Sequence, residues 1–224
     1  MDSIKIKNLY SPENTNAAPL LQKYEYPYEV LPHISDFILE YGKTLDKNLY
    51  DEKPGGIFIA KSAEVAATAY ITGPCIIGEN TQVRHCAFIR GSAFIGDNCV
   101  VGNSTEIKNA IIFNNVQVPH YNYVGDSILG YRSHMGAGSI TSNVKSDKTP
   151  VKIRVGERVI ETGIKKIGAF LGDFVEVGCG SVLNPGTIIG KNTIIYPLSM
   201  VRGYVPENSI YKKQGEVAKR LDEC

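Results

Sequence analysis

Arg90 and Lys108 are two basic residues 18 positions apart, and each directly follows an isoleucine. If the fold brings them together, their like charges repel by about 1 kcal/mol even in water. A phosphate group would reverse that cost, because it accepts charge-assisted hydrogen bonds from both side chains. The spacing alone leaves two interpretations open: a phosphate-binding corner, and two solvated side chains that splay apart.

His120 lies in the segment VPHYNYVGD, in which a proline precedes it and Asn122 follows shortly after. Imidazole titrates near pH 6.5, so a histidine can accept a proton from a substrate at neutral pH. His120 is therefore a candidate general base. The alternative is a surface histidine at a turn.

His134, in HMGAGS, raises the question of a metal site together with His85 and His120. Their spacing does not match a zinc-ligand pattern, so we expect no metal. Cys179, in VGCGS, has no visible activating neighbour, which a reactive thiol needs. We therefore expect Cys179 to pack or to contact a ligand rather than to act as a nucleophile.

A repeat of six residues runs through most of the chain. Aliphatic residues occupy every sixth position in two runs: Ile59, Val65, Ile71, Ile77, Val83, Ile89, Ile95, Val101 and Ile107, then Leu171, Val177, Leu183, Ile189, Ile195 and Val201. A small or β-branched residue stands two positions before each of them. Gly often follows the aliphatic residue, where we expect it to ease the turn.

Residues i and i−2 of a strand point to the same side, so both repeated positions face inward. Short strands that turn every six residues make a triangular coil of 18 residues, and stacked coils pair in parallel about 4.8 Å apart. The repeat therefore predicts a mainly β fold: a single-stranded left-handed parallel β-helix, an exception to the right-handed crossover rule. Its coils place Lys108 directly next to Arg90 at one corner.

The pattern divides the chain into three parts. Residues 57–205 form the β-helix, which a loop at 142–166 interrupts, with a hairpin expected around Val155-Gly156-Glu157. Residues 1–56 form a small α-helical N-terminal cap, in which residues 29–43 predict an amphipathic helix that packs near the open first coil. Residues 206–224 form a tail, and its segment EVAKRLDEC predicts a short helix over the other end.

The composition excludes several classes of protein. The 224 residues carry a net charge of +1, without the excess positive charge of a nucleic-acid-binding protein. No apolar run approaches the ~18–20 residues of a membrane span, and the first residues lack the apolar core of a secretory signal. Five cysteines without a CxxC pair fit reduced thiols. We therefore expect a cytoplasmic protein with neither a nucleic-acid nor a membrane partner.

The hexads resemble those of the hexapeptide-repeat acyltransferases. The segment VGNSTEIKNAIIFNNVQVPHYNYVGD, continued by MGAGSITSN, is similar to the acetyltransferase domain of the bifunctional UDP-N-acetylglucosamine pyrophosphorylase/glucosamine-1-phosphate N-acetyltransferases. The resemblance covers roughly residues 57–205. It implies a homotrimer that binds acetyl-CoA, as co-substrate, between adjacent prisms.

The resemblance also implies roles for particular residues. Arg90 and Lys108 fall where the family binds the phosphate of the acceptor. His120 falls on the general base that takes a proton from the glucosamine amine, and Tyr123 falls on an acceptor-site tyrosine. The predicted phosphate corner and the predicted base thus belong to one site.

Four further positions complete the implied site. Ala137 and Cys179 fall on the lining of the acetyl-CoA groove, and Asn143 matches an acceptor contact contributed by a neighbouring subunit. The family has a sugar-contacting asparagine where this chain has His134, and a serine where it has Cys179. The loop at 142–166 is longer than in the family. No nucleotidyltransferase signature occurs, and residues 1–56 are too few for that domain, so we expect no pyrophosphorylase activity.

We therefore expect an acetyltransferase that moves an acetyl group from acetyl-CoA to an amino group of a phosphorylated or nucleotide-linked sugar. We expect no tightly bound cofactor or metal. Two alternatives stay open. A non-catalytic sugar-nucleotide sensor or regulatory subunit is favoured by His134 and by the missing partner domain. A zinc hydrolase of the carbonic-anhydrase type is disfavoured, because that class has two histidines five apart and this chain has none.

Overall fold

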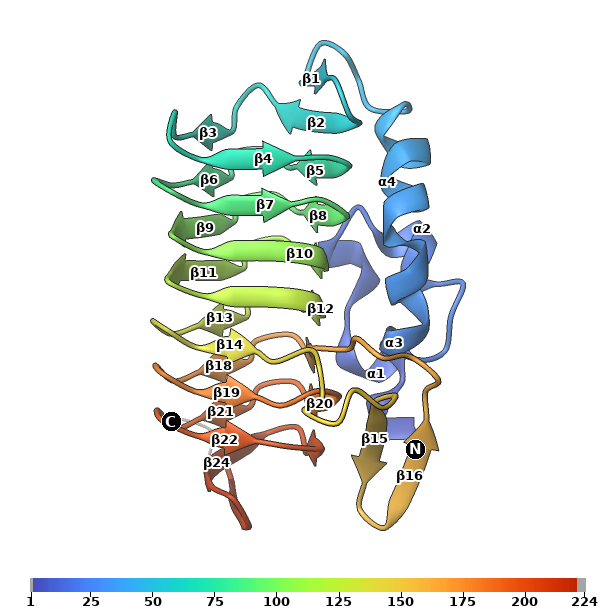
Figure 1. Cartoon of the computed structure of the whole chain (residues 1–224), viewed down its shortest axis with the longest axis vertical. Helices are drawn as coiled ribbons and strands as arrows, with labels where there is room; N and C mark the ends of the chain where they lie inside the picture. The colour runs from blue at the N-terminus through green and yellow to red at the C-terminus, as the bar shows by residue number, and fades with distance from the viewer. Residues whose placement is uncertain (1, 221–224) are drawn as a thin grey trace.

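The computed structural model describes residues 2–220 and shows a triangular β-helix whose coils stack along one axis (Figure 1). Each coil contributes one short strand to each of three flat faces. Neighbouring coils pair in parallel, so that Ile71 lies beside Ile89 and Ile89 lies beside Ile107. This arrangement confirms the predicted left-handed parallel β-helix.

The three faces are named here by what lies outside them. The open face consists of β4 (Tyr70–Thr72), β7 (Phe88–Arg90), the first halves of β10 (Glu106–Ile112) and β12 (Tyr123–Leu129), β14 (Ile140–Thr141), β19 (Val182–Leu183) and β22 (Met200–Val201). The covered face consists of β2 (Ile57–Ala60), β5 (Cys75–Ile77), β8 (Ala93–Ile95), the second halves of β10 and β12, β17 (Ala169–Leu171), β20 (Thr187–Ile189) and β23 (Tyr204–Val205). The polar face consists of β3 (Glu64–Val65), β6 (Gln82–Val83), β9 (Val100–Asn103), β11 (Gln117–His120), β13 (His134–Met135), β18 (Glu176–Val177), β21 (Ile194–Ile195) and β24 (Ser209–Lys213).

The aliphatic residues of the repeat form the core of the prism. All fifteen are buried except Val65 and Ile71, which lie in the first coil, where no complete coil covers them from above. Burial of each such side chain contributes roughly 1.5–3 kcal/mol before the loss of chain entropy is counted. The core is therefore a continuous column of branched side chains along the axis.

The glycine after the aliphatic residue is needed because the backbone of the next coil lies very close to it. The positive φ angle of the turn falls at another residue. A side chain at Gly102 would overlap the backbone of Pro119 on the next coil. The left-handed backbone conformation falls two residues later, at Ser104 (φ 53°) and, in the preceding corner, at Asn98 (φ 56°). The prediction that glycine eases the turn was therefore wrong in its cause, because the constraint comes from the neighbouring coil.

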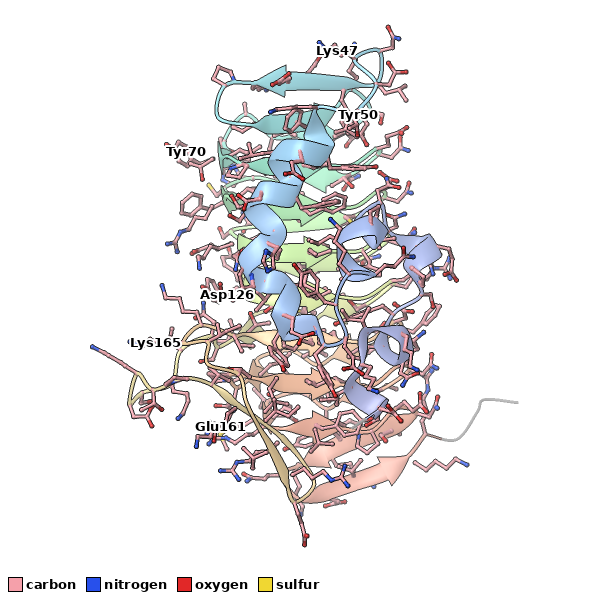
Figure 2. The ribbon with its side chains drawn as sticks, turned by 90° about the vertical axis from the view of Figure 1, so that its right-hand side faces the viewer. Lys47, Tyr50, Tyr70, Asp126, Glu161 and Lys165 are labelled. Atoms are coloured by element: carbon pink, nitrogen blue, oxygen red, sulfur yellow. The ribbon has the colours of Figure 1, made fainter. Side chains whose placement is uncertain are left out.

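The N-terminal helices cover one side of the prism instead of its first coil, which corrects the predicted position. They comprise η1 (Asp2–Ile4), α1 (Ile6–Leu9), η2 (Pro12–Asn14), α2 (Ala18–Leu21), α3 (Pro27–Val30), η3 (Leu31–His33) and α4 (Ile34–Gly42). Helix α4 runs along the covered face and packs on β5, β8 and β10 (Figures 1 and 2). Ile34, Phe37 and Ile38 are buried in that contact, as the amphipathic pattern predicted.

The outward side chains of the covered face explain why the helices lie there. They are apolar in coil after coil and at most 3% exposed: Phe58, Ile76, Phe94, Ile111, Ile128, Phe170 and Ile188. This second apolar stripe cannot face water without a large loss of burial energy. Among the described residues, no helix is long and apolar enough to cross a bilayer.

At each end of the β-helix, an antiparallel strand pairs with one face of the terminal coil. At the first coil, β1 (Tyr50–Lys53) pairs with β2, and at the last coil β25 (Glu216–Lys219) pairs with β24. The predicted C-terminal helix was therefore wrong for residues 216–219, and residues 221–224 lie outside the described part. A strand satisfies the exposed backbone groups of a coil edge, which a helix cannot do.

The loop at 142–166 contains the expected hairpin. Strands β15 (Lys152–Val155) and β16 (Arg158–Glu161) pair in antiparallel register. Val151 and Ile153 are fully buried against the prism, so the hairpin is docked on the protein surface.

A carboxylate placed inside the column tests the inward register. We expect Ile89→Asp to lower the free energy of unfolding by about 3 kcal/mol or more, because an unpaired charge would be buried. Gln117→Asp, an outward and exposed position on β11, is the matched control and should leave stability nearly unchanged. Urea unfolding measures both, and an Ile89→Asp protein as stable as the control would contradict the register.

Candidate functional site

His120 lies on an edge of the prism, where the polar face meets the open face. Gly138 donates its backbone N–H to the carbonyl of His120 (3.0 Å), and Gly180 donates to the carbonyl of Ala137 (2.8 Å). These bonds place Ala137 and Cys179 at the position of His120 on the next two coils. All three residues are exposed, and we call this line of positions the His120 edge.

A buried asparagine holds the corner that carries His120. The Asn122 carboxamide oxygen accepts the backbone N–H of His120 (3.0 Å), and its nitrogen donates to the carbonyls of Gly136 (2.8 Å) and Ser139 (3.1 Å) on the next coil. No side chain within residues 2–220 bonds to the imidazole. The corner is therefore fixed while the ring stays available to exchange a proton, and the role of Asn122 was not predicted.

Arg90 and Lys108 lie one coil apart, as predicted, on the edge between the open and covered faces. Each has its own carboxylate: Arg90 pairs with Glu106 at 2.6 Å, and Lys108 pairs with Asp126 at 3.1 Å. The expected repulsion is therefore already offset inside the chain. Charge repulsion alone therefore does not call for a phosphate at this corner, because Glu106 and Asp126 supply the counter-charges.

Asp126 is the centre of a polar cluster that the sequence analysis did not single out. The residue is 3% exposed and accepts hydrogen bonds from Lys108, from Asn109 (2.8 Å) and from Asn143. Asn143 also donates to the hydroxyl of Tyr123 at 3.1 Å. The structure thus brings Lys108, Tyr123 and Asn143 of one chain together, and we call them, with Asn109 and Asp126, the Lys108 cluster.

Tyr123 keeps its proton in this cluster. Burial, with Asp126 and Glu106 nearby, raises the pKa of the Tyr123 hydroxyl. The group therefore remains a neutral hydroxyl at physiological pH. It can donate a hydrogen bond to an anionic or carbonyl oxygen on the open face.

Lys108, Asn109 and Asp126 of the Lys108 cluster lie on the opposite side of the open face from the His120 edge. Residues Tyr123–Gly125 of β12 span the distance between them, which is about 10 Å for three extended residues. Figure 2 labels Asp126 on the side of the molecule next to α4. A ligand that contacts both groups of one chain must lie across the open face.

His134 lies apart from the other predicted residues of the acceptor site. It is on the polar face, where its Nδ1 is 2.9 Å from a carboxylate oxygen of Glu176. Within one chain, His134 therefore does not face the Lys108 cluster.

The cysteines fall into two classes. Burial raises the pKa of Cys75 and Cys99 to about 12, so both remain thiols in the core. Cys86 and Cys179 are exposed. Within residues 2–220, no group of three histidine, cysteine or acidic side chains is placed to hold a metal ion.

Comparisons with known proteins agree with this architecture. The family profile of the GMPPB C-terminal domain matches residues 71–164. The chain is 38% identical over 113 residues to the bifunctional protein GlmU of Methanococcus maripaludis, over 50% of this chain and 27% of that protein. It is 32% identical over 158 residues to a bifunctional sugar-1-phosphate nucleotidylyltransferase/acetyltransferase of Sulfurisphaera tokodaii, over 70% of this chain and 39% of that protein.

A third relative matches over most of both chains. It is the uncharacterized acetyltransferase YaiX of Escherichia coli, 32% identical over 169 residues, which are 75% of this chain and 74% of that protein. The chain belongs to the hexapeptide-repeat acetyltransferase family. Its coils and its GlmU-like segment confirm the resemblance found in the sequence. The chain spans about a quarter of the length of the GlmU relatives that it matches.

Asp126 is more buried than Glu106, so its removal should lower the free energy of unfolding more. Asp126→Ala leaves the ammonium of Lys108 and two amides without their acceptor, so we expect a loss of about 3–5 kcal/mol in the free energy of unfolding. Glu106→Ala removes only the half-buried partner of the exposed Arg90 and should change stability far less. Urea denaturation of both variants measures the two losses of stability. Equal midpoints would show that Asp126 does not stabilise the Lys108 cluster.

Proposed function

We propose that the protein transfers an acetyl group from acetyl-CoA to an amino group of a phosphorylated or nucleotide-linked sugar. The observation that carries the proposal is the alignment of an unbonded imidazole, His120, with Ala137 and Cys179 along one edge of a family acetyltransferase. The acetyltransferase names of the relatives, one of which acts on a sugar-1-phosphate, support the substrate class. The proposal covers acetyl transfer alone, because the match to the bifunctional relatives covers only part of their length.

His120 acts as general base in the proposed reaction. Its neutral imidazole takes a proton from the sugar amine while the nitrogen attacks the thioester carbonyl. The tetrahedral intermediate then collapses, the C–S bond breaks, and the imidazolium returns a proton to the leaving thiolate. The backbone N–H of Ala137 donates no hydrogen bond to any residue in 2–220 and is available to donate to the oxyanion.

The Lys108 cluster and Arg90 bind the acceptor in this proposal. Lys108 and Tyr123 supply donors on the open face, and the exposed Arg90 can exchange Glu106 for a phosphate oxygen. His134 would reach an acceptor only from a neighbouring subunit, since it lies on the polar face. Asn143 is proposed to contact the acceptor as well.

We further propose a homotrimer in the cytoplasm, with acetyl-CoA held between adjacent prisms. Apolar side chains along the open face support association: Tyr70 is 67% exposed and Met200 is 50% exposed. A second copy packed on this face would cover them. The groove between two prisms would then include the His120 edge.

Replacement of the base should slow the chemical step. We expect His120→Ala to lower kcat by about 10²–10⁴-fold with little change in acceptor KM. His85→Ala is the matched control, because His85 occupies the same edge two coils away and bonds to Thr68. Release of free CoA thiol is measured with a panel of amino-sugar phosphates and nucleotide amino sugars. Turnover equal in both variants would rule out His120, and binding of sugar nucleotides without turnover of any acceptor would favour the sensor.

Cysteine labelling tests the position of acetyl-CoA. At pH 8 an alkylating reagent should modify the exposed Cys86 and Cys179 and spare Cys75 and Cys99, which are buried and whose pKa burial raises to about 12. Saturating acetyl-CoA should slow labelling of Cys179 at least tenfold and leave Cys86, on the same edge, unchanged. Mass spectrometry of tryptic peptides reports each site. Equal protection of both cysteines, or of neither, would place the cofactor elsewhere.

A further inference from the structure

A cavity of about 380 Å³ lies between the β15–β16 hairpin and the prism. Residues 144–147 and strand β15 form one wall, and the corners Asn184–Pro185 and Arg202–Gly203 form the other. The hairpin approaches the prism closely because the facing corners are glycines. Gly186 and Gly203 both have φ near +80°, and a side chain on Gly186 would collide with Val151.

The lining of the cavity is strongly basic. It contains Lys145, Lys152, Arg154 and Arg202 against one acidic residue, Asp147. Two of the cations have partners, because Lys145 pairs with Asp147 at 3.2 Å and Lys152 pairs with Glu161 at 2.7 Å. In the part of the chain that the structure describes, neither Arg154 nor Arg202 has an ion pair or a side-chain hydrogen bond.

The backbone segments that carry Arg154 and Arg202 lie next to each other. The carbonyl oxygen and Cβ of Arg154 lie 3.3 and 3.9 Å from where a Cβ on Gly203 would be, and Gly203 directly follows Arg202. Both side chains line the same cavity, and like charges that share a cavity repel. At the Arg90–Lys108 corner two carboxylates offset that repulsion, whereas here Asp147 pairs with Lys145 and no described carboxylate pairs with either arginine. An anion would offset it instead.

We propose that this cavity binds the pyrophosphate group of a ligand. Guanidinium groups donate in a planar fork that matches phosphate oxygens, which makes paired arginines suited to a diphosphate. The cavity also adjoins the proposed acceptor site, since Ser142 lines it and the next residue, Asn143, belongs to the Lys108 cluster. The anion site itself stands without the proposed reaction; only the identity of its ligand rests on that function.

The position of the cavity fits a ligand that extends from the open face. Backbone bonds connect the corner of Asp126 to Gly168, Gly168 to Gly186, and Ile188 to Gly203. Three coil steps of about 4.8 Å separate Asp126 from Gly203, which is ~14 Å along the edge. Figure 2 labels Asp126 above Lys165 and Glu161 of the hairpin segment on the same side of the molecule. Nucleotide sugars and CoA both carry a pyrophosphate and are the two candidate sources.

Calorimetric titration with inorganic pyrophosphate tests the site in the whole protein. We expect Arg154→Gln and Arg202→Gln each to weaken pyrophosphate binding at least tenfold, and the double variant to lose less than the product of both effects. Arg158→Gln, an exposed position on β16 outside the cavity, is the matched control and should bind within twofold of the native protein. Unchanged melting temperatures confirm that all four variants fold.

Two further arms identify the source of the pyrophosphate. UDP represents nucleotide sugars, and CoA represents the acyl donor; the one whose affinity falls at least tenfold in Arg154→Gln and Arg202→Gln is the ligand. The proposal would be overturned if pyrophosphate did not bind at millimolar concentration, or if all variants bound it equally. It would also be overturned if the two substitutions changed the affinity of neither UDP nor CoA. Because these titrations involve no turnover, an inactive protein would refute the proposed reaction without affecting this test.

Discussion

Backbone hydrogen bonding between successive coils determines where every functional side chain lies. Each coil repeats the path of its neighbour about 4.8 Å away, so residues with the same place in their hexads line up along a face or an edge. His120, Ala137 and Cys179 share an edge because Gly138 and Gly180 bond to the coil before them. Their side chains need no contact with one another, and the inward aliphatic residues supply the energy that holds the stack.

This dependence explains how much could be predicted from the sequence. Hexads with an aliphatic residue at each sixth position determine the coil, and the coil determines that Arg90 and Lys108 are neighbours. The outward residues are less constrained by the repeat. Glu106 and Asp126 pair with those cations through side-chain conformations that spacing does not specify. The apolar stripe from Phe58 to Ile188 lies on the outward positions next to the inward aliphatic residues, so the hexad repeat itself does not predict it.

The remaining differences arise where the repeat stops. The hairpin was predicted from its glycine turn, but its docking on Gly186 depends on long-range contacts, so the basic cavity had no signal in the hexads. The tail resembled a helix in composition, yet an unpaired coil edge favours a strand there. The need of the coil edge for backbone hydrogen-bond partners thus outweighed the helical preference of the local sequence. The role of Tyr123 came from family resemblance alone, whereas His120 was already a candidate base from its chemistry and its segment.

The antiparallel strands at the two ends of the prism bear on self-association. A β-helix with bare terminal coils presents parallel edges to which another copy can add, as in the growth of a fibre. Here β1 and β25 reverse the chain direction at the first and last coils, and the exposed β1 carries Asp51, Glu52 and Lys53. Each strand therefore opposes the addition of another copy, β1 on the covered face at one pole and β25 on the polar face at the other.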